Sequence, residues 1–158
     1  MHAEKLEHMT HLHGNTLVPK THPRIRLRGK LDSLQALILL AARQARDAHQ
    51  YRTAKVLDEF HLFAQEILRC EVTEEPLQAF TLLGLDSAGL RHASHNPPGG
   101  KHPIPTSGMP ALALTLNYLR TQVREAEICA VEVGRPDLIE ALNRFSSAVH
   151  LLFLRTLS

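Results

Sequence analysis

Residues 110–133 read PALALTLNYLRTQVREAEICAVEV and carry a clear helical pattern. Apolar side chains recur in this stretch every three or four residues, which is the spacing of one helix face. These side chains are Leu112, Leu116, Leu119 and Val123. Pro110 suits the first turn of a helix, and Gly134 is typical of the residue that follows one. The stretch therefore predicts one long helix with a core-facing stripe.

Three ionic side chains lie beside that stripe. Arg120, Arg124 and Glu127 are spaced i, i+4 and i+7, so on one helix they share a face. Charges next to a core-facing stripe need partners, because removing a charge from water without a partner is unfavourable. The partner is either a carboxylate across a bundle or an anionic ligand.

The chain outside this stretch predicts more helices of the same kind. The long ones are expected at residues 31–48, 53–69 and 136–157, and the short ones at 76–83 and 87–95. Residues 96–110 hold several prolines and glycines and predict a loop. Since no strand pattern competes, the predicted fold class is all-α, an up-and-down helical bundle of about five helices.

Residues 1–30 lack a helical period and predict an irregular N-terminal arm. Pro19 and Pro23 interrupt regular structure there, so we interpret the segment as loop or extended chain. The chain then divides into this arm, residues 1–30, and a helical domain over residues 31–158. A length of 158 residues suits a single domain with a sizeable core.

The composition argues against a general nucleic-acid-binding protein and against a membrane-spanning one. The formal net charge is +2 at pH 7, too close to neutral for general binding of nucleic acid. No run approaches the roughly 18 consecutive apolar residues of a membrane span. Cys70 and Cys129 lie inside helical patterns without a secretory segment upstream, which predicts a reduced, cytoplasmic setting.

Two polar segments at opposite ends of the chain together predict an ATP site. The first has the spacing Lys20-x-x-x-Arg24-x-x-x-x-Gly29-x-x-Asp32. The second is Arg120-Thr121-x-x-Arg124-x-x-Glu127, followed by Asn143-Arg144. Fixed cations suit a polyphosphate, and an asparagine within a helix favours a hydrogen-bonding role.

These segments resemble the ATP-dependent corrinoid adenosyltransferases of the propanediol-utilisation type. Several individual sequence motifs are more similar to the ethanolamine-utilisation branch of this family. Motifs similar to that branch are Thr10-His11-Leu12, Leu31-Asp32-Ser33 and Arg135-Pro136-Asp137-Leu138-Ile139. The resemblance runs from about Thr10 to the C-terminus, and the ordered set of motifs is more specific than any one of them.

The resemblance implies an enzyme that transfers the 5′-deoxyadenosyl group of ATP to Co(I) of a corrinoid such as cobalamin and releases triphosphate. It also implies a bundle that forms a homotrimer, with ATP, Mg²⁺ and corrinoid at subunit interfaces. A cytoplasmic location, association with a bacterial microcompartment, and a flavoprotein reductase or a cobalamin-dependent lyase as partner are further expectations. Neither nucleic acid nor a membrane is an expected partner.

Three of the implied site residues precede the first predicted helix. The positions that match Lys20 and Arg24 belong to the family's phosphate-binding region. Thr10 opens the segment that stands where the propanediol-type enzymes have a glycine-rich loop. All three are therefore expected to contact ATP.

The other implied site residues belong to the helices. The positions that match Asp32 and Arg120 pair across helices in the family. Those that match Arg124, Glu127 and Asn143 face the nucleotide, with Glu127 beside Mg²⁺. Because cobalt is the nucleophile, Asp32, Arg120, Arg124 and Glu127 are expected to act in catalysis by charge placement.

Simpler interpretations exist for the same residues. Arg124 and Glu127 could form a surface ion pair, and Asp32 could favour the positive end of a helix dipole. The alternative functions are a non-catalytic trimeric module that binds a nucleotide or another anion, and an ATP hydrolase in which Glu127 and Mg²⁺ activate water. Adenosyl transfer leaves triphosphate whereas hydrolysis releases phosphate, so the product separates the two reactions.

The N-terminal arm is rich in histidine. His8, His11 and His13 could hold a divalent transition metal through imidazole nitrogens, since alternate residues of an extended chain project to one side. The resemblance implies a metal held by histidine and cysteine in an N-terminal extension, and no cysteine precedes Cys70 in this sequence. A flexible polar arm is the other interpretation.

Overall fold

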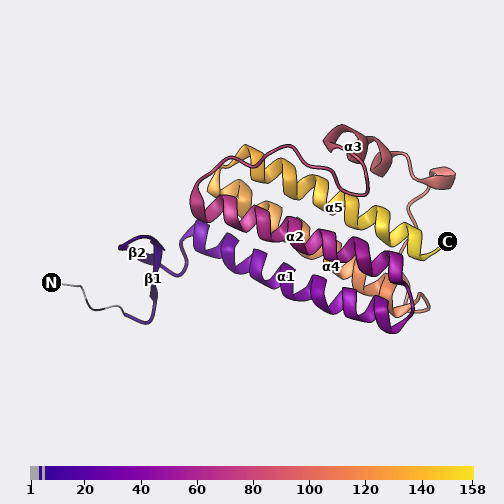
Figure 1. Cartoon of the computed structure of the whole chain (residues 1–158), viewed down its shortest axis with the longest axis horizontal. Helices are drawn as coiled ribbons and strands as arrows, with labels where there is room; N and C mark the ends of the chain where they lie inside the picture. The colour runs from indigo at the N-terminus through magenta and orange to yellow at the C-terminus, as the bar shows by residue number, and fades with distance from the viewer. Residues whose placement is uncertain (1–3, 5) are drawn as a thin grey trace.

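Four long helices form the body of the molecule in the computed structural model, which describes residue 4 and residues 6–158 (Figure 1). They are α1 (Pro23–Asp47), α2 (Tyr51–Thr73), α4 (Ala111–Val133) and α5 (Pro136–Thr156). The shorter α3 (Ser87–His95) packs on α5, and the 3-10 turn η1 (Pro98–Gly100) follows it. The predicted all-α bundle is confirmed.

Neighbouring helices of the bundle run antiparallel (Figure 1). Helix α1 packs against both α2 and α4, and α4 packs against α5. The core between them contains Phe60 of α2 and Phe145 of α5, whose ring centroids lie 5.4 Å apart edge to face. The predicted stripe of α4 is buried: Leu116, Leu119 and Val123 are 0% exposed. The ionic face of α4 therefore lies at the edge of this core.

Helix α1 begins at Pro23, and the prediction of a start at residue 31 is wrong. The boundary drawn at residue 30 between arm and bundle thus falls inside α1. Pro23 suits the first turn because it lacks an N–H, and the His22 side chain caps the turn by accepting from the Arg24 N–H at 3.1 Å. Leu27 is buried in line with Leu31, so this turn belongs to the core.

Residues 76–83 do not form the predicted short helix. Glu74 ends α2 in the left-handed conformation, with φ 62°, and the chain then has no helix until α3, apart from a turn closed by an isolated bridge between Leu82 and Leu85. The Leu77 N–H donates to Oδ2 of Asp137 at 3.0 Å, so α5 supplies the acceptor that a helical turn would have supplied. The helix predicted at residues 87–95 is confirmed as α3, and the loop predicted at 96–110 contains η1.

The N-terminal arm contains a two-stranded antiparallel hairpin, β1 (Met9–His13) and β2 (Thr16–Pro19). The hairpin lies beyond the end of the bundle at which α1 begins (Figure 1). The sequence predicted extended chain here without a paired strand. None of the helices in the described ranges is long and apolar enough to cross a membrane.

Candidate functional site

A cavity of about 570 Å³ opens between α4, α5, the end of α3 and the loop after it. Helix α4 contributes its predicted ionic face to this cavity, and α5 contributes a polar face. The polar lining residues are Ser94, His95, His102, Asn117, Arg120, Arg124, Glu127, Asn143, Ser146, Ser147 and His150. The structure thus brings Arg120, Arg124, Glu127 and Asn143 together, as the sequence predicted for one site.

The two arginines leave positive charge uncompensated at this cavity. Arg120 donates from Nε and Nη2 to Oδ1 of Asn117, at 3.3 and 3.1 Å. Burial, and then the nearby Arg124, lower the pKa of Arg120 from its usual value. Within the described residues no carboxylate lies within ion-pair distance of either arginine. An anion in the cavity would supply the missing charge.

Glu127 and Asn143 meet across the helix pair. Nδ2 of Asn143 donates to Oε1 of Glu127 at 3.0 Å. Oδ1 of Asn143 accepts from Nη1 of Arg144 at 2.6 Å, and Nε of Arg144 donates to the Ser87 carbonyl at 3.0 Å. The amide is therefore fixed from both sides. No protein donor in the described part of the chain bonds Oε2 of Glu127, which leaves this oxygen suited to a hard cation.

Histidines that are not among the predicted site residues also line the cavity. Nδ1 of His102, in the loop before α4, lies 2.8 Å from Nε2 of His150 on α5. Burial, and then His102 and Arg120, lower the pKa of His150. The pattern that could have identified His150 is its spacing of i+7 from Asn143, which places both on one face of α5.

The N-terminal site residues lie elsewhere in the chain. Thr10 is in β1, and Lys20 follows β2 with its side chain exposed. Arg24 lies at the end of the bundle, where it forms ion pairs with Glu71 and Glu74 beside a second cavity of about 480 Å³. None of these three residues lines the cavity at α4 and α5. A single chain therefore holds the two halves of the predicted ATP site apart.

Asp32 is exposed on α1, and the described residues contain no ion pair between it and Arg120. Nearby on α1, Lys30 reaches α4 instead: its Nζ donates to Oε1 of Gln122 at 3.0 Å and pairs with Glu125. The contact predicted between Asp32 and Arg120 is thus not formed within one chain.

The predicted metal ligands His8, His11 and His13 do not form a metal site in the part of the arm that the structure describes. A register irregularity separates His11 from His13 in β1, so the regular alternation of side chains that underlies a shared metal site is broken. No group of three or more histidine, cysteine or acidic side chains within residues 6–158 has the arrangement of a metal site. Nε2 of His13 instead lies 3.9 Å from Oε1 of Glu74.

Comparison with known proteins bears on this site. The family model described as cobalamin adenosyltransferase matches residues 4–156. The proteins named corrinoid adenosyltransferase EutT from Salmonella typhimurium (strain LT2) and Escherichia coli (strain K12) are each 32% identical to the chain over 163 residues. The match covers 96% of this chain and 60% of each relative, so the chain spans about 60% of their length. No solved structure matches. Because the family model spans nearly the whole chain, the protein belongs to the cobalamin adenosyltransferase family.

Proposed function

We propose that the protein transfers the 5′-deoxyadenosyl group of ATP to Co(I) of a corrinoid. The cobalt electron pair forms the Co–C bond to the 5′ carbon while the bond from that carbon to the triphosphate oxygen breaks. Cobalt is oxidised in this step, and triphosphate leaves with the bonding electrons. The observation that carries the proposal is the cavity in which Arg124, beside Arg120 and Glu127, lacks a carboxylate partner in the described residues.

The residues of this cavity suit the departure of triphosphate. The leaving group accumulates negative charge as the bond breaks, and positive charge fixed in advance stabilises that state most effectively. Arg120 is held by Asn117, so its guanidinium does not need to reorganise when charge develops. Arg124, exposed beside it, adds a planar fork of donors that matches phosphate oxygens.

Glu127 is the residue that would hold Mg²⁺ beside the phosphates. Its carboxylate fits a hard cation, because Asn143 bonds one oxygen and the second has no protein donor in the described part of the chain. When bound, Mg²⁺ supplies charge neutralisation of the phosphate oxygens. Among the described residues, His8, His11 and His13 form no group suited to a transition metal, so we assign these three no role in the reaction.

We further propose that three chains assemble so that the hairpin region of one subunit completes the cavity of its neighbour. Thr10, Lys20 and Arg24 would then join Arg124 at the nucleotide, and Asp32 would pair with Arg120 across the interface. Exposed apolar side chains support an interface on α1 and α4; they are Leu39, Leu40, Tyr118, Ile128 and Val131. Leu39 follows Asp32 at i+7, so the two share a face.

The resemblance to the ethanolamine-utilisation branch supports a proposal for where the enzyme works and with which proteins. In that setting the enzyme works in the cytoplasm in association with a microcompartment. A flavoprotein reductase would supply the reduced corrinoid, or a cobalamin-dependent lyase would receive the product.

Product analysis tests the proposal against hydrolysis. Anaerobic incubation of the protein with ATP, Mg²⁺ and chemically reduced cobalamin should release intact triphosphate in amounts that match the alkylated corrinoid. Arg124→Ala should suppress triphosphate release. Arg43→Ala, which removes an exposed arginine paired with Asp47 elsewhere on the bundle, should not. Release of inorganic phosphate independent of the corrinoid would identify a hydrolase instead.

A further inference from the structure

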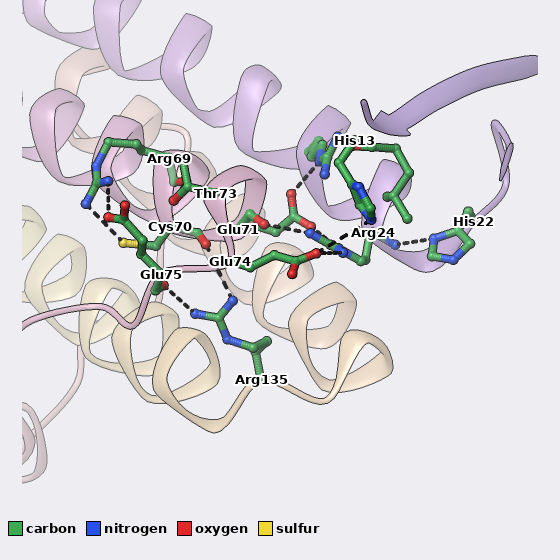
Figure 2. A network of polar contacts seen from close by, with 12 residues as sticks. His13, His22, Arg24, Arg69, Cys70, Glu71, Thr73, Glu74, Glu75 and Arg135 are labelled. Atoms are coloured by element: carbon green, nitrogen blue, oxygen red, sulfur yellow. Dashed lines mark hydrogen bonds and ion pairs between the residues drawn. The ribbon is translucent and has the colours of Figure 1, made fainter. Parts of the chain in front are cut away.

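Glu71 is a fully buried acidic residue in the middle of an arginine network. Its side chain, near the end of α2, is 0% exposed. Nε of Arg24 donates to Oε1 of Glu71, and Nε of Arg28 donates to Oε2. The two arginines stand one turn apart on α1, so both carboxylate oxygens are held by one helix face. Figure 2 shows Glu71 and Arg24 in this network.

The same network reaches the N-terminal hairpin. Nη1 of Arg28 donates to the Leu12 carbonyl of β1 at 2.7 Å. Nη1 of Arg24 donates to Oε1 of Glu74 at 2.9 Å, and that carboxylate lies 3.9 Å from Nε2 of His13 (Figure 2). In the described part of the chain, the side-chain hydrogen bonds and ion pairs that join the hairpin to the bundle are Arg28 with Leu12 and Glu74 with His13. Glu71 is the buried group on which Arg28 is anchored.

One feature of this network is unfavourable for stability, so a stabilising role alone does not explain the network. Nη2 of Arg28 is buried and has no hydrogen-bond partner. An unsatisfied buried donor is unfavourable, and apolar side chains often replace a buried ion pair without loss of stability. A planar guanidinium at residue 28, however, can hold Glu71 and the Leu12 carbonyl at once. The geometry therefore favours a role in placing β1.

We propose that Glu71 is a positioning residue for ATP. By anchoring Arg28, it sets the orientation of the hairpin relative to α1 and so presents Thr10 and Lys20 to the nucleotide. This inference rests on the proposed function, in which the hairpin supplies part of the ATP site. Glu71 itself contacts neither ATP nor the corrinoid.

Two substitutions separate positioning from simple stabilisation. Glu71→Gln keeps the side-chain shape but faces one arginine with an N–H donor, so one anchor is lost. Arg28→Lys keeps a positive charge beside Glu71 but loses the fork that also reaches Leu12. Arg46→Lys is the matched control, because Arg46 pairs with Asp58 of α2 from the same helix without touching the hairpin.

The mobility of the hairpin is measured without ATP, by electron paramagnetic resonance. A nitroxide label is attached to the cysteine of an Asn15→Cys variant, at the exposed tip of the hairpin. A Cys129→Ser background removes the partly exposed native thiol, and Cys70 is buried. Glu71→Gln and Arg28→Lys should both increase the mobility of the label, whereas Arg46→Lys should leave it unchanged. Circular dichroism should report the same helicity for all variants.

The kinetic readout uses the same variants without the label. Glu71→Gln and Arg28→Lys should raise the KM for ATP at least about tenfold, with kcat and the KM for cobalamin changed less than about twofold. Unchanged label mobility in Arg28→Lys would overturn the inference, even if Glu71→Gln failed to fold. Increased mobility with an unchanged KM for ATP would also overturn it. Wild-type activity is measured separately. Absence of the proposed reaction can therefore be distinguished from failure of Glu71 to orient the hairpin.

Discussion

Asn143 on α5 donates a hydrogen bond of 3.0 Å to Oε1 of Glu127 on α4. These residues stand 16 positions apart in the chain, on opposite sides of the turn that joins the two helices. The contact holds a carboxylate at the wall of a cavity whose other charges are Arg120 and Arg124. Negative and positive groups are therefore fixed side by side where a metal-bound polyphosphate needs both.

Glu127→Gln should lower turnover more than it lowers cobalamin affinity. The substitution removes the charge that would hold Mg²⁺ beside the leaving group and leaves the shape of the side chain. Steady-state kinetics and cobalamin titration on the same preparation measure the two effects. Glu125→Gln is the control, because Glu125 lies on the same helix but pairs with Lys30. Equal losses in both variants would contradict the role of Glu127.

Lys20→Ala and Arg124→Ala should each weaken ATP binding by about 1.5–3 kcal/mol, the usual contribution of a charge-assisted contact. Helicity should stay unchanged, because both side chains are accessible to solvent in the single chain. Isothermal titration calorimetry measures the affinities. Wild-type affinity in either variant would place the phosphates elsewhere.

Asp32 and Arg120 should be coupled only in the assembled protein. Within one chain Asp32 is exposed to solvent and Arg120 hydrogen-bonds Asn117. The two side chains therefore do not depend on each other in the monomer. A double-mutant cycle with Asp32→Asn and Arg120→Gln should give an interaction energy of about 0.5–3 kcal/mol for trimer assembly. Light scattering supplies the assembly constants. Additive effects, or a stable wild-type monomer at micromolar concentration with ATP, would refute the pairing.

Asp137 should make stability dependent on pH in the acid range. Hydrogen bonds from Arg135, and then those from the Leu77 and Leu138 N–H groups, lower the pKa of Asp137 to about 2 against the opposing effect of burial. Because the folded pKa lies below the unfolded value of about 3.9, the carboxylate stabilises the fold above that pH and loses its contribution as the pH falls toward about 2.

The corresponding variant is Asp137→Asn. It should reduce the free energy of unfolding by about 1 kcal/mol at neutral pH, after allowance for solvent screening of a partly exposed pair. The difference from wild type should shrink as the pH falls from about 4 to about 2 in urea titrations. Asp47→Asn, in an exposed i, i+4 pair with Arg43, should change stability by less at every pH. A difference that does not vary with pH would contradict the assignment.

Helical periodicity predicted most of the fold, and the exceptions have physical causes. The start of α1 was missed because Arg24, Arg26 and Arg28 alternate with apolar residues, which resembles an extended arm. The arginines at 24 and 28 become compatible with a packed helix because Glu71 pairs with both of them and Glu74 pairs with Arg24. A glutamate in an amphipathic helix is normally solvated, so nothing in the sequence marked Glu71 as buried.

The residues of the candidate site were likewise predictable where they lie on regular helices and not predictable elsewhere. Arg120, Arg124 and Glu127 could be predicted as one group, because helical spacing fixes which side chains of one helix share a face. Asn143, on α5, was added to this group by the resemblance alone. The positions of Lys20 and Arg24 could not, since a hairpin and the first turn of α1 place them at the end of the bundle. His102 and His150 meet through a loop, and loop conformation has no period from which to predict the contact.

The most direct test is the visible spectrum of cobalamin under anaerobic reducing conditions. With the wild-type protein, ATP and Mg²⁺, the spectrum of Co(I) should give way to that of an alkylcobalamin, and illumination should destroy this product because the Co–C bond is light-sensitive. Arg124→Ala should slow its formation, and Arg43→Ala should not. If no light-sensitive alkylcobalamin forms while ATP is present, the protein does not catalyse adenosyl transfer.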